Sequence, residues 1–407
     1  MNADDCATAI QRLQFKVNAL DPIRVAFYVV YDSAFPGRAL LQELNQDSRF
    51  DVYVVLVPDT MRGAENMALQ IKKSRESLEN IGVPIILGYN EDNAQYIDVS
   101  EYMDMVCFSN PYDEITHEIF GVNYLRGKSL LPFYIDYTFS VTKYCLKINT
   151  RDVMRNFWAI FVSTEDSFRE ILDVLTTSGK SAEINRYILS GYCKMDLYKQ
   201  TVTMPRERKC VILAPHHTIL QWKDGLEIGG FLDYSEAMQE LPLRYSTVDF
   251  VFRPHPLLFV HLRRDDIWGQ SKTQTYLDRL LANPNVKFSD EPEYFSIFSG
   301  SDALIHDCGS FVAEYLFTGK PACFLRSNRT VIEDQFNAIG RKCIQHHYLA
   351  PETGAMFDFM DQVVVNDCDP MRDDRVNFVE RDLSINYPHA AGAIARHIRD
   401  VLRMSQS

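Results

Sequence analysis

The sequence of 407 residues lacks long apolar runs, paired cysteine motifs and an excess of positive charge. No segment approaches the roughly 18 uninterrupted apolar residues of a membrane span. The first residues, MNADDCATAIQRLQF, are acidic where a signal peptide is basic. We therefore expect a cytoplasmic protein, either soluble or peripherally associated with the inner face of the cell membrane.

Nine cysteines are scattered from Cys6 to Cys368 without a CxxC pair or a matching His/Cys cluster. This spacing argues against a zinc site and against a disulfide framework, and we expect no metal and no cofactor. The net charge of −13 argues against nucleic acid as a partner, because Lys and Arg supply most of the affinity for its phosphates. A local groove that binds one small anion is still compatible with this composition.

Two series of short apolar runs, separated by helix-length segments, are present instead. The first series lies at 23–31, 51–57, 83–88, 104–109, 130–135, 158–163 and 187–191, and the second at 210–215, 248–256, 286–289, 302–307, 321–325 and 362–367. Fully apolar strands of this kind are typical of parallel sheets covered on both faces.

We therefore predict an α/β protein with two Rossmann-like domains and a cleft between them. The polar segment 194–209 is interpreted as the linker. The N-terminal domain covers residues 1–200 and the C-terminal domain 205–380. An amphipathic helix within about 383–407 is expected to pack back toward the first domain.

Polar residues follow the predicted strands of the second series, where ligands bind in doubly wound sheets. Arg253-Pro254-His255-Pro256 place a guanidinium and an imidazole at one strand end, where both can reach a phosphate. The alternative is a rigid loop in which His255 caps a neighbouring carbonyl.

A second candidate is the turn Asp307-Cys308-Gly309-Ser310, which follows a strand and opens a helix that ends at Gly319. Backbone N–H groups, the Ser310 hydroxyl and the helix dipole would converge there on an anion. Glu314, one turn further on, would accept hydrogen bonds from ribose hydroxyls. Alternatively, Ser310 is a simple N-cap and Glu314 a solvated helix residue.

The third strand end carries Pro215 and the pair His216-His217. A histidine there can bind phosphate or move a proton, although a partly exposed pair in a loop is an equal alternative. His346-His347 follow no predicted strand and are interpreted as structural.

In the first domain, Asp32 and Asp136 follow strands and are candidates for the base that deprotonates an acceptor hydroxyl. Each aspartate has a simpler alternative role, the satisfaction of loop amides.

Together these motifs resemble the CDP-glycerol glycerophosphotransferase family, GT-B enzymes that build teichoic-acid and capsular polymers. That family shows a strand followed by A-P-T, a strand followed by R-x-H-P, and a stretch like I-T-D-Y-S-S-x-x-x-D-Y-L-x-x-x-x-P. This chain reads Ala214-Pro215-His216, Arg253-Pro254-His255-Pro256, Ile305-His306-Asp307-Cys308-Gly309-Ser310, Glu314-Tyr315-Leu316 and Pro321. The resemblance covers roughly residues 186–326.

The resemblance implies a GT-B fold in which His255 and Ser310 contact the donor pyrophosphate, with Arg253 alongside and Glu314 in place of the ribose-binding aspartate. It implies a metal-independent transferase that moves a glycerol-phosphate or other polyol-phosphate unit, or a glycosyl unit, from a nucleotide donor, CDP- or CMP-linked in preference to UDP-linked. The acceptor would be a bacterial surface glycan or a lipid-linked glycan.

One departure concerns the acceptor side. The family carries a first-domain histidine within W-H-G-T or Q-H-G, whereas this chain reads Tyr134-Ile135-Asp136-Tyr137-Thr138. A UDP-sugar glycosyltransferase, a 2-epimerase-like enzyme on the same fold, and a catalytically degenerate nucleotide- or glycan-binding scaffold therefore stay open. The sequence does not specify the donor base, the acceptor or the oligomeric state.

Overall fold

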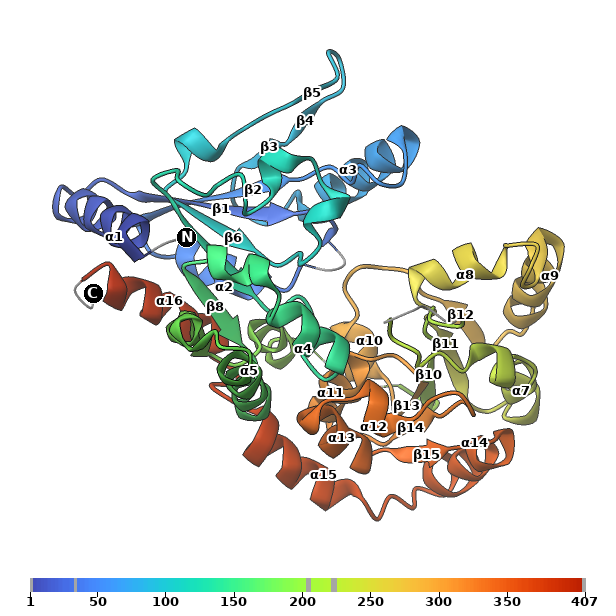
Figure 1. Ribbon diagram of the computed structural model, residues 1–407. Helices are drawn as coiled ribbons and strands as arrows, with labels where there is room; N and C mark the ends of the chain where they lie inside the picture. Colours follow the sequence, from blue (N-terminus) through green and yellow to red (C-terminus); the bar gives the residue numbers. More distant parts are fainter. Residues whose placement is uncertain (1–2, 33–34, 203–205, 221–224, 405–407) are drawn as a thin grey trace. The chain divides into compact units, whose positions relative to one another are not determined.

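The computed structural model describes residues 3–32, 35–202, 206–220 and 225–404. The chain divides into two compact units (Figure 1). Unit 1 comprises Met1–Phe139, Lys147–Lys199 and Ser384–Ser407, and unit 2 comprises Ser140–Leu146 and Gln200–Leu383.

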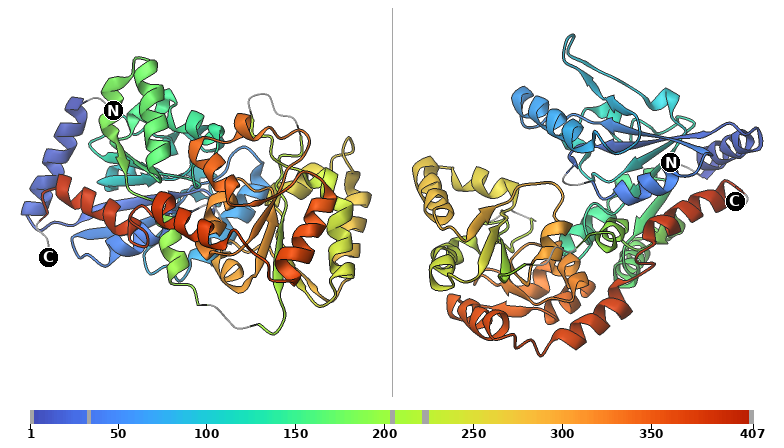
Figure 2. Two further views of the ribbon diagram at one scale, coloured as in Figure 1. Left: turned by 90° about the horizontal axis from the view of Figure 1, so that it is seen from below. Right: turned by 180° about the vertical axis from the view of Figure 1, so that it is seen from behind.

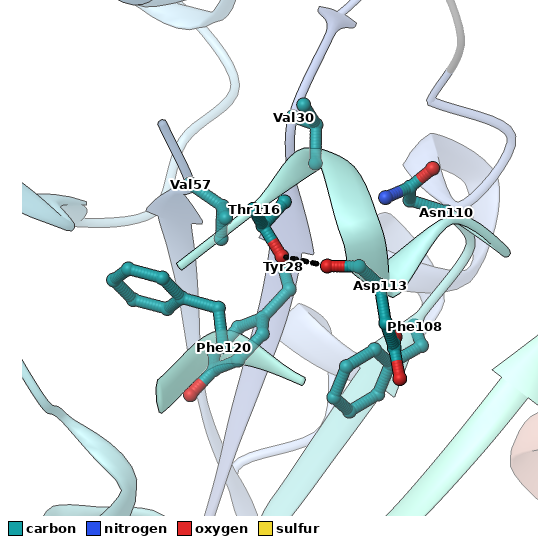
Figure 3. A pocket seen from close by; sticks show the side chains of 8 residues that line it. All are labelled: Tyr28, Val30, Val57, Phe108, Asn110, Asp113, Thr116 and Phe120. Carbon is teal, nitrogen blue, oxygen red and sulfur yellow. Dashed lines mark hydrogen bonds between the residues drawn. The ribbon is translucent and has the colours of Figure 1, made fainter. Parts of the chain in front are cut away.

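Unit 1 is built on a seven-stranded parallel sheet in the order β3-β2-β1-β6-β7-β8-β9. The strands are β1 (Ile23–Val29), β2 (Phe50–Leu56), β3 (Ile85–Leu87), β6 (Met105–Phe108), β7 (Leu131–Ile135), β8 (Ala159–Val162) and β9 (Tyr187–Leu189). After β3 the chain crosses to the other side of β1, so the topological switch point lies between β1 and β6. A shallow hollow borders the carboxyl ends of β1, β2 and β6 (Figure 3).

The helices of unit 1 are α1 (Ala3–Asn18), α2 (Arg38–Asn45), α3 (Ala64–Leu78), α5 (Glu165–Thr177), α6 (Asp196–Lys199) and α16 (Ala390–Val401). Short 3-10 turns occur at η2 (Ser100–Tyr102), η3 (Asp113–Ile115), η4 (Glu118–Phe120), η5 (Asp152–Asn156), η6 (Ser181–Arg186) and η7 (Cys193–Met195), and β4 (Tyr89–Asn90) pairs with β5 (Gln95–Tyr96). Helix α5 begins where the Thr164 hydroxyl accepts the N–H of Ser167 at 3.2 Å, an ordinary N-cap.

The C-terminal helix α16 belongs to unit 1, as the sequence predicted (Figure 2). Its apolar face includes Ile394 and Ile398, which are buried in the core of unit 1 next to α2. The buried carboxylate of Asp196 accepts the N–H groups of Ala390 and Ala391 at 3.2 and 2.7 Å, which caps the start of the helix.

Unit 2 repeats the same strand order in a six-stranded parallel sheet, β12-β11-β10-β13-β14-β15. The strands are β10 (Cys210–Ala214), β11 (Asp249–Phe252), β12 (Val286–Phe288), β13 (Ala303–His306), β14 (Ala322–Leu325) and β15 (Tyr348–Ala350). The switch point of this sheet lies between β10 and β13.

Both faces of the second sheet are covered. Val211 and Leu213 belong to one buried cluster, while Ile212, which points to the opposite face, is also fully buried. The helical elements are α7 (Phe231–Arg244), α8 (Pro256–Leu262), α9 (Gly269–Leu281), α10 (Phe295–Gly300), α11 (Phe311–Glu314), η8 (Tyr315–Thr318), α12 (Ile332–Gln335), α13 (Ala338–Gln345), α14 (Thr353–Phe359), η9 (Met360–Val365), α15 (Arg372–Phe378) and η10 (Val379–Leu383), while α4 (Lys143–Asn149) crosses the division between the units along the chain.

The predicted α/β fold with two parallel sheets is confirmed, but the last predicted strand of the second series is wrong. Residues 360–365 form the π-helical turn η9, which continues α14, and the sixth strand is β15. Val363 and Val364 are buried against the core of unit 2 from this turn. A short apolar run fits a buried helix as well as a strand, which explains the error.

Among the described residues, no helix has both the length and the apolar character needed to cross a bilayer.

Candidate functional site

The three strand ends singled out in the second half of the sequence lie on neighbouring strands of unit 2. Strand β10 pairs with β11 on one side and with β13 on the other. The N–H of Arg253 donates to the carbonyl of Leu213 at 2.8 Å, and the N–H of His255 donates to that of Pro215 at 2.9 Å. The loops after β10 and β11 therefore run side by side at the carboxyl edge, next to the switch point.

Asp307, in the loop after β13, forms buried hydrogen bonds to the segment that follows β10. Its side chain is fully buried, and its two oxygens accept the N–H groups of His216 and Gly230. Gly230 is the N-cap residue of α7. Burial raises the pKa of Asp307 to about 7. The geometry makes Asp307 a positioning residue that holds His216 and the start of α7.

His216 presents a neutral N–H donor. Its Nδ1 lies 3.0 Å from the hydroxyl of Thr218, whose oxygen already accepts the N–H groups of Ile228 and Gly229 at 3.4 and 3.1 Å. The hydroxyl proton is thus left to point at Nδ1, which assigns the imidazole proton to Nε2. Burial, together with the neighbouring imidazoles, holds the pKa of His216 well below its ordinary value.

His255 is fixed in the same tautomer by a different contact. It is the N-cap residue of α8, and its Nδ1 accepts the N–H of Leu257 at 3.2 Å. Because Nδ1 is an acceptor, the proton of the neutral ring is on Nε2. His255 thus caps a backbone N–H through Nδ1, whereas the alternative expected from the sequence was a cap on a neighbouring carbonyl.

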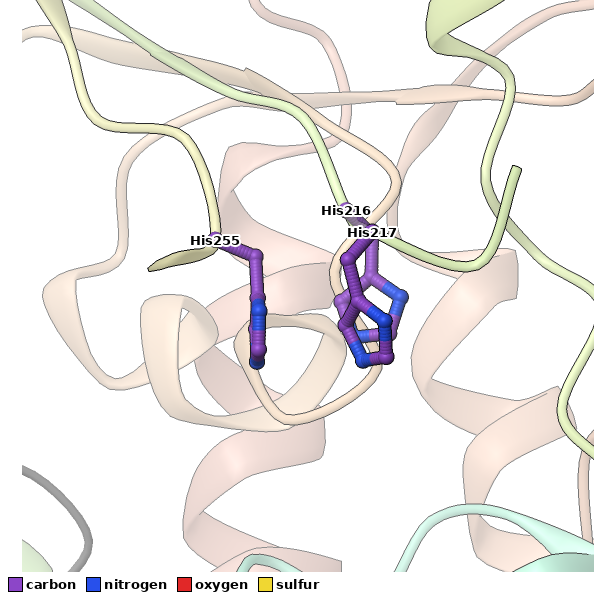
Figure 4. Close-up of side chains that lie close together, drawn as sticks. All are labelled: His216, His217 and His255. Carbon is purple, nitrogen blue, oxygen red and sulfur yellow. The ribbon is translucent and has the colours of Figure 1, made fainter. Parts of the chain in front are cut away.

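The imidazoles of His216, His217 and His255 form a cluster (Figure 4). Their ring nitrogens come within 4.8 Å of one another, a spacing that can hold a metal ion. A metal ligand needs a lone pair, however, and the contacts above place protons on Nε2 of His216 and His255. If Nε2 of His255 bound a metal ion, the ring proton would have to move to Nδ1. That proton would then face the N–H of Leu257, and the hydrogen bond between them would be lost. The cluster is therefore better matched to an anion.

Arg253 follows β11 at the same edge, and its guanidinium already donates hydrogen bonds to other residues of unit 2. Its Nη1 donates to the Ser289 hydroxyl at 2.8 Å, and its Nη2 donates to the Glu291 carbonyl at 2.6 Å. The guanidinium carbon lies 5.1 Å from the ring centre of Tyr294. These contacts fix the plane of the guanidinium and use two of its five N–H groups.

The turn after β13 differs in detail from the expectation. The helix that follows Ser310 has one short α-helical turn, α11, and then continues as 3-10 turn η8 up to Gly319, which has a φ of +70°. So short a helix has a small dipole. The Ser310 side chain makes no capping hydrogen bond, and its hydroxyl lies 3.8 Å from the Cys308 sulfur.

Gly309 is not required by the backbone. A Cβ placed there would make only ordinary contacts, the nearest at 3.5 Å from Ile228. The turn is held instead by His306, whose Nδ1 accepts the N–H of Cys308 at 3.2 Å. A glycine at this edge leaves room for a ligand to approach the backbone closely.

Glu314 is buried, with 1% of its surface exposed, and not solvated as the alternative interpretation had it. Its Oε2 accepts the hydroxyl proton of Tyr294, whose pKa is raised well above its ordinary value by burial and by Glu314. Glu314, Tyr294 and Arg253 therefore form one connected chain of side chains next to the edge.

The two aspartates proposed for the acceptor side have different surroundings. Asp136 is buried, and its oxygens accept a hydrogen bond from Asn149 at 3.0 Å and two from Ser163. Burial raises the pKa of Asp136 to about 6. These contacts tie the ends of β7 and β8 together, which fits the alternative of satisfying loop groups. Oδ2 of Asp32 is buried and has no hydrogen-bond partner in the described part of the chain.

Sequence reasoning missed two features of the edge. His261, on α8, belongs to none of the motifs identified in the sequence. Its Nδ1 lies 2.9 Å from the carbonyl oxygen of His217 and holds the loop that carries His217. The Gly229-Gly230 pair closes the loop onto Thr218, where a Cβ on Gly229 would lie 2.8 Å from the backbone. The two adjacent glycines in the sequence, which directly precede α7 in the structure, were the available signal.

Neither a protein-family model nor a curated protein sequence matches this chain. Solved structures do share its fold. UDP-GlcNAc 2-epimerase from Neisseria meningitidis bound to UDP-GlcNAc matches with a TM-score of 0.59 and 15% identity, over 93% of this chain and 100% of that one. S. aureus MnaA with UDP matches with a TM-score of 0.59 and 12% identity, over 95% and 98%. The wall teichoic acid polymerase TagF soaked with CDPG matches with a TM-score of 0.58 and 12% identity, over 99% of each chain. The chain thus has the GT-B-type fold found in nucleotide-sugar enzymes.

Proposed function

We propose that unit 2 binds the pyrophosphate of a nucleotide-activated donor at the edge formed by His216, His255 and the Gly309-Ser310 turn. The observation that carries the proposal is the pair of imidazoles whose N–H tautomers are fixed by Thr218 and by the N–H of Leu257. Neutral N–H donors that are already oriented stabilise a phosphate without reorganisation. Arg253 would add a charge-assisted hydrogen bond from its remaining N–H groups.

We further propose that the protein is a metal-independent transferase that moves a polyol-phosphate or glycosyl unit to a glycan or lipid-linked acceptor. The leaving nucleotide would carry its negative charge away on phosphate oxygens that His216, His255 and Arg253 contact. Glu314 would complete the donor site on the ribose side, with Tyr294 holding its carboxylate. Among the acceptor-side aspartates, Asp32 is favoured over Asp136 because one of its oxygens is without a donor among the described residues.

The experiment is isothermal titration of the full-length protein with CDP, UDP, CDP-glycerol and UDP-GlcNAc in the presence of EDTA. We expect at least one nucleoside diphosphate to bind, and His216→Ala to weaken it by about tenfold or more, the value of one hydrogen bond to a charged group. His389→Ala, which replaces an exposed histidine of unit 1, serves as the control. Absence of binding by every nucleotide would refute the proposal.

A second candidate is a UDP-sugar 2-epimerase, which the shared fold with the epimerases favours. Incubation with UDP-GlcNAc and no acceptor separates the two reactions. An epimerase forms an isomeric sugar product under these conditions, whereas a transferase leaves the sugar configuration unchanged until an acceptor is added.

A further inference from the structure

A second hollow lies at the carboxyl edge of unit 2, where the segment after β10 meets the loop after β14. It is lined by Thr218, Leu220, Glu227, Gly229, Ser327 and Arg329. The free space admits a group of about the size of one water or hydroxyl. The hydroxyl of Thr218 also lies 3.0 Å from Nδ1 of His216. A group that enters the hollow of unit 2 is therefore a close neighbour of a ligand held by His216.

The walls of this hollow are tied together by hydrogen bonds to the backbone. Nη1 of Arg329 donates to the Ile219 carbonyl at 3.1 Å. The Thr330 hydroxyl donates to the Glu227 carbonyl at 3.2 Å. The N–H of Glu227 donates in turn to the side-chain oxygen of Gln335 at 2.9 Å. The hollow is thus formed before a ligand arrives, which lowers the entropic cost of binding.

The two charged side chains of the hollow are open to solvent and only partly used within the protein. Glu227 is half-buried and Arg329 is exposed. In the described part of the chain the Glu227 carboxylate has no hydrogen-bond or ion-pair partner, although both of its backbone groups are bonded. Arg329 uses one of its five side-chain N–H groups on the Ile219 carbonyl. The hollow therefore offers a ligand one negatively charged acceptor and several positively charged donors.

This combination matches a neutral hydroxyl group. A hydroxyl can donate its proton to the carboxylate while its oxygen accepts an N–H of the guanidinium. A phosphate is a poorer match, because the negative charge of Glu227 repels it. An apolar group would give neither charged side chain a new partner. Sugars and polyols carry several hydroxyls, and they are the groups that a nucleotide diphosphate commonly activates.

We propose that the hollow of unit 2 binds a hydroxyl of the group attached to the nucleotide, with Glu227 as acceptor and Arg329 as donor. The inference rests on the proposed donor site and extends it beyond the pyrophosphate. The phosphates at His216 and the hydroxyl in the hollow then belong to one ligand, a nucleoside diphosphate linked to a polyol or a sugar. Glu227 and Arg329 determine specificity, because free nucleoside diphosphate has no such hydroxyl beyond its terminal phosphate.

The test compares CDP-glycerol with CDP, and UDP-GlcNAc with UDP, by isothermal titration of the full-length protein in EDTA. We expect at least one complete donor to bind more tightly than its nucleoside diphosphate by about tenfold or more, the value of a hydrogen bond to a charged group. Glu227→Ala should remove most of this ratio. The matched control is Glu333→Ala, which deletes an exposed carboxylate of α12 in the same unit. It should keep the wild-type ratio, and both variants should bind the nucleoside diphosphate equally well.

The outcomes separate the hollow from the donor site itself. If nucleotides bind but the attached glycerol or sugar adds no affinity, or if Glu227→Ala keeps the wild-type ratio, the role of the hollow is refuted and the proposed function stands. An equal loss for donor and nucleoside diphosphate would place the contact on the nucleotide and refute it as well. Absence of binding by all four nucleotides refutes both proposals. Should urea unfolding reveal a folding defect in Glu227→Ala, Glu227→Gln takes its place, and it must still lower the ratio because its hydrogen bond carries no charge.

Discussion

Replacing His255 by two different amides separates its two contacts. In the structure, Nδ1 caps α8 by accepting the N–H of Leu257, while Nε2 carries the proton that we propose is donated to the donor's phosphates. An Asn side chain places its oxygen near the position of Nδ1 and nothing near Nε2. A Gln side chain can place its amide N–H near the position of Nε2 but is a poor N-cap.

The expected magnitudes differ for the two contacts. A hydrogen bond to a charged group contributes about 1.5 to 3 kcal/mol, which corresponds to about 10- to 150-fold in affinity. An N-cap contributes about 0.5 to 2 kcal/mol to the free energy of unfolding. We therefore expect His255→Asn to lose nucleotide affinity but keep its stability, and His255→Gln to lose stability but keep most of its affinity.

Calorimetry with the bound nucleotide in EDTA gives the affinities, and urea unfolding gives the stabilities. His255→Ala should show both losses, and His389→Gln, in the exposed control position, should show neither. The tautomer assignment would be refuted by wild-type affinity in the Asn variant. If the wild type bound nucleotide tightly only after Zn²⁺ was added, and His255→Gln did not bind it under the same conditions, the imidazoles would instead be metal ligands.

Two further predictions concern buried aspartates. The pKa of Asp307 lies above its ordinary value of 3.8, at about 7, so folding favours its protonated form. Its contribution to stability is full below about pH 4 and is lost as the pH rises through 7, by up to about 4 kcal/mol. The free energy of unfolding in urea should therefore decline less between pH 4 and 8 for Asp307→Asn than for the wild type. Equal declines in the two proteins would contradict the raised pKa of Asp307. Asp196→Ala removes the cap of α16 and should lower the free energy of unfolding by about 1 to 2 kcal/mol, with an unchanged nucleotide affinity. No loss of stability in that variant would mean that the cap contributes little.

The sequence predicted the two sheets well because the strands are short, apolar and buried on both faces, and such runs stand out between polar helices. It also pointed to the carboxyl edge of unit 2, since Arg253 directly follows β11 and His255 and Ser310 lie in the loops that come after β11 and β13. The contacts of these residues were not predictable, because they depend on partners far away in the sequence. Tyr294, for example, lies 20 residues before Glu314 and removes it from solvent.

The acceptor side shows the same limit more strongly. Asp136 follows a strand as an active-site residue would, yet Ser163 and Asn149 occupy its oxygens. Asp113 lines the hollow of unit 1 but follows no strand directly, since it lies in a 3-10 turn that no strand pattern marks. Only the packing of η3 against the end of β2 places it beside the hollow.

The charge of the protein leads to a last prediction about salt. A chain with a net charge of −13 repels a nucleotide at long range, so its affinity must come from donors in direct contact. Burial keeps His216 a neutral donor, and Arg253 is a charged group among the described residues at this edge. Salt shortens the Debye length from about 10 Å at 0.1 M to about 3 Å at 1 M, which weakens the long-range repulsion and leaves the short contacts largely unaffected. We therefore expect the nucleotide affinity to hold or to rise between about 0.1 and about 1 M NaCl. A groove lined by several lysines and arginines behaves in the opposite way, since each released counterion weakens binding as salt increases. Calorimetric titrations at the two concentrations decide between them, and a loss of about tenfold or more would show that mobile cations, rather than oriented imidazoles, hold the phosphates.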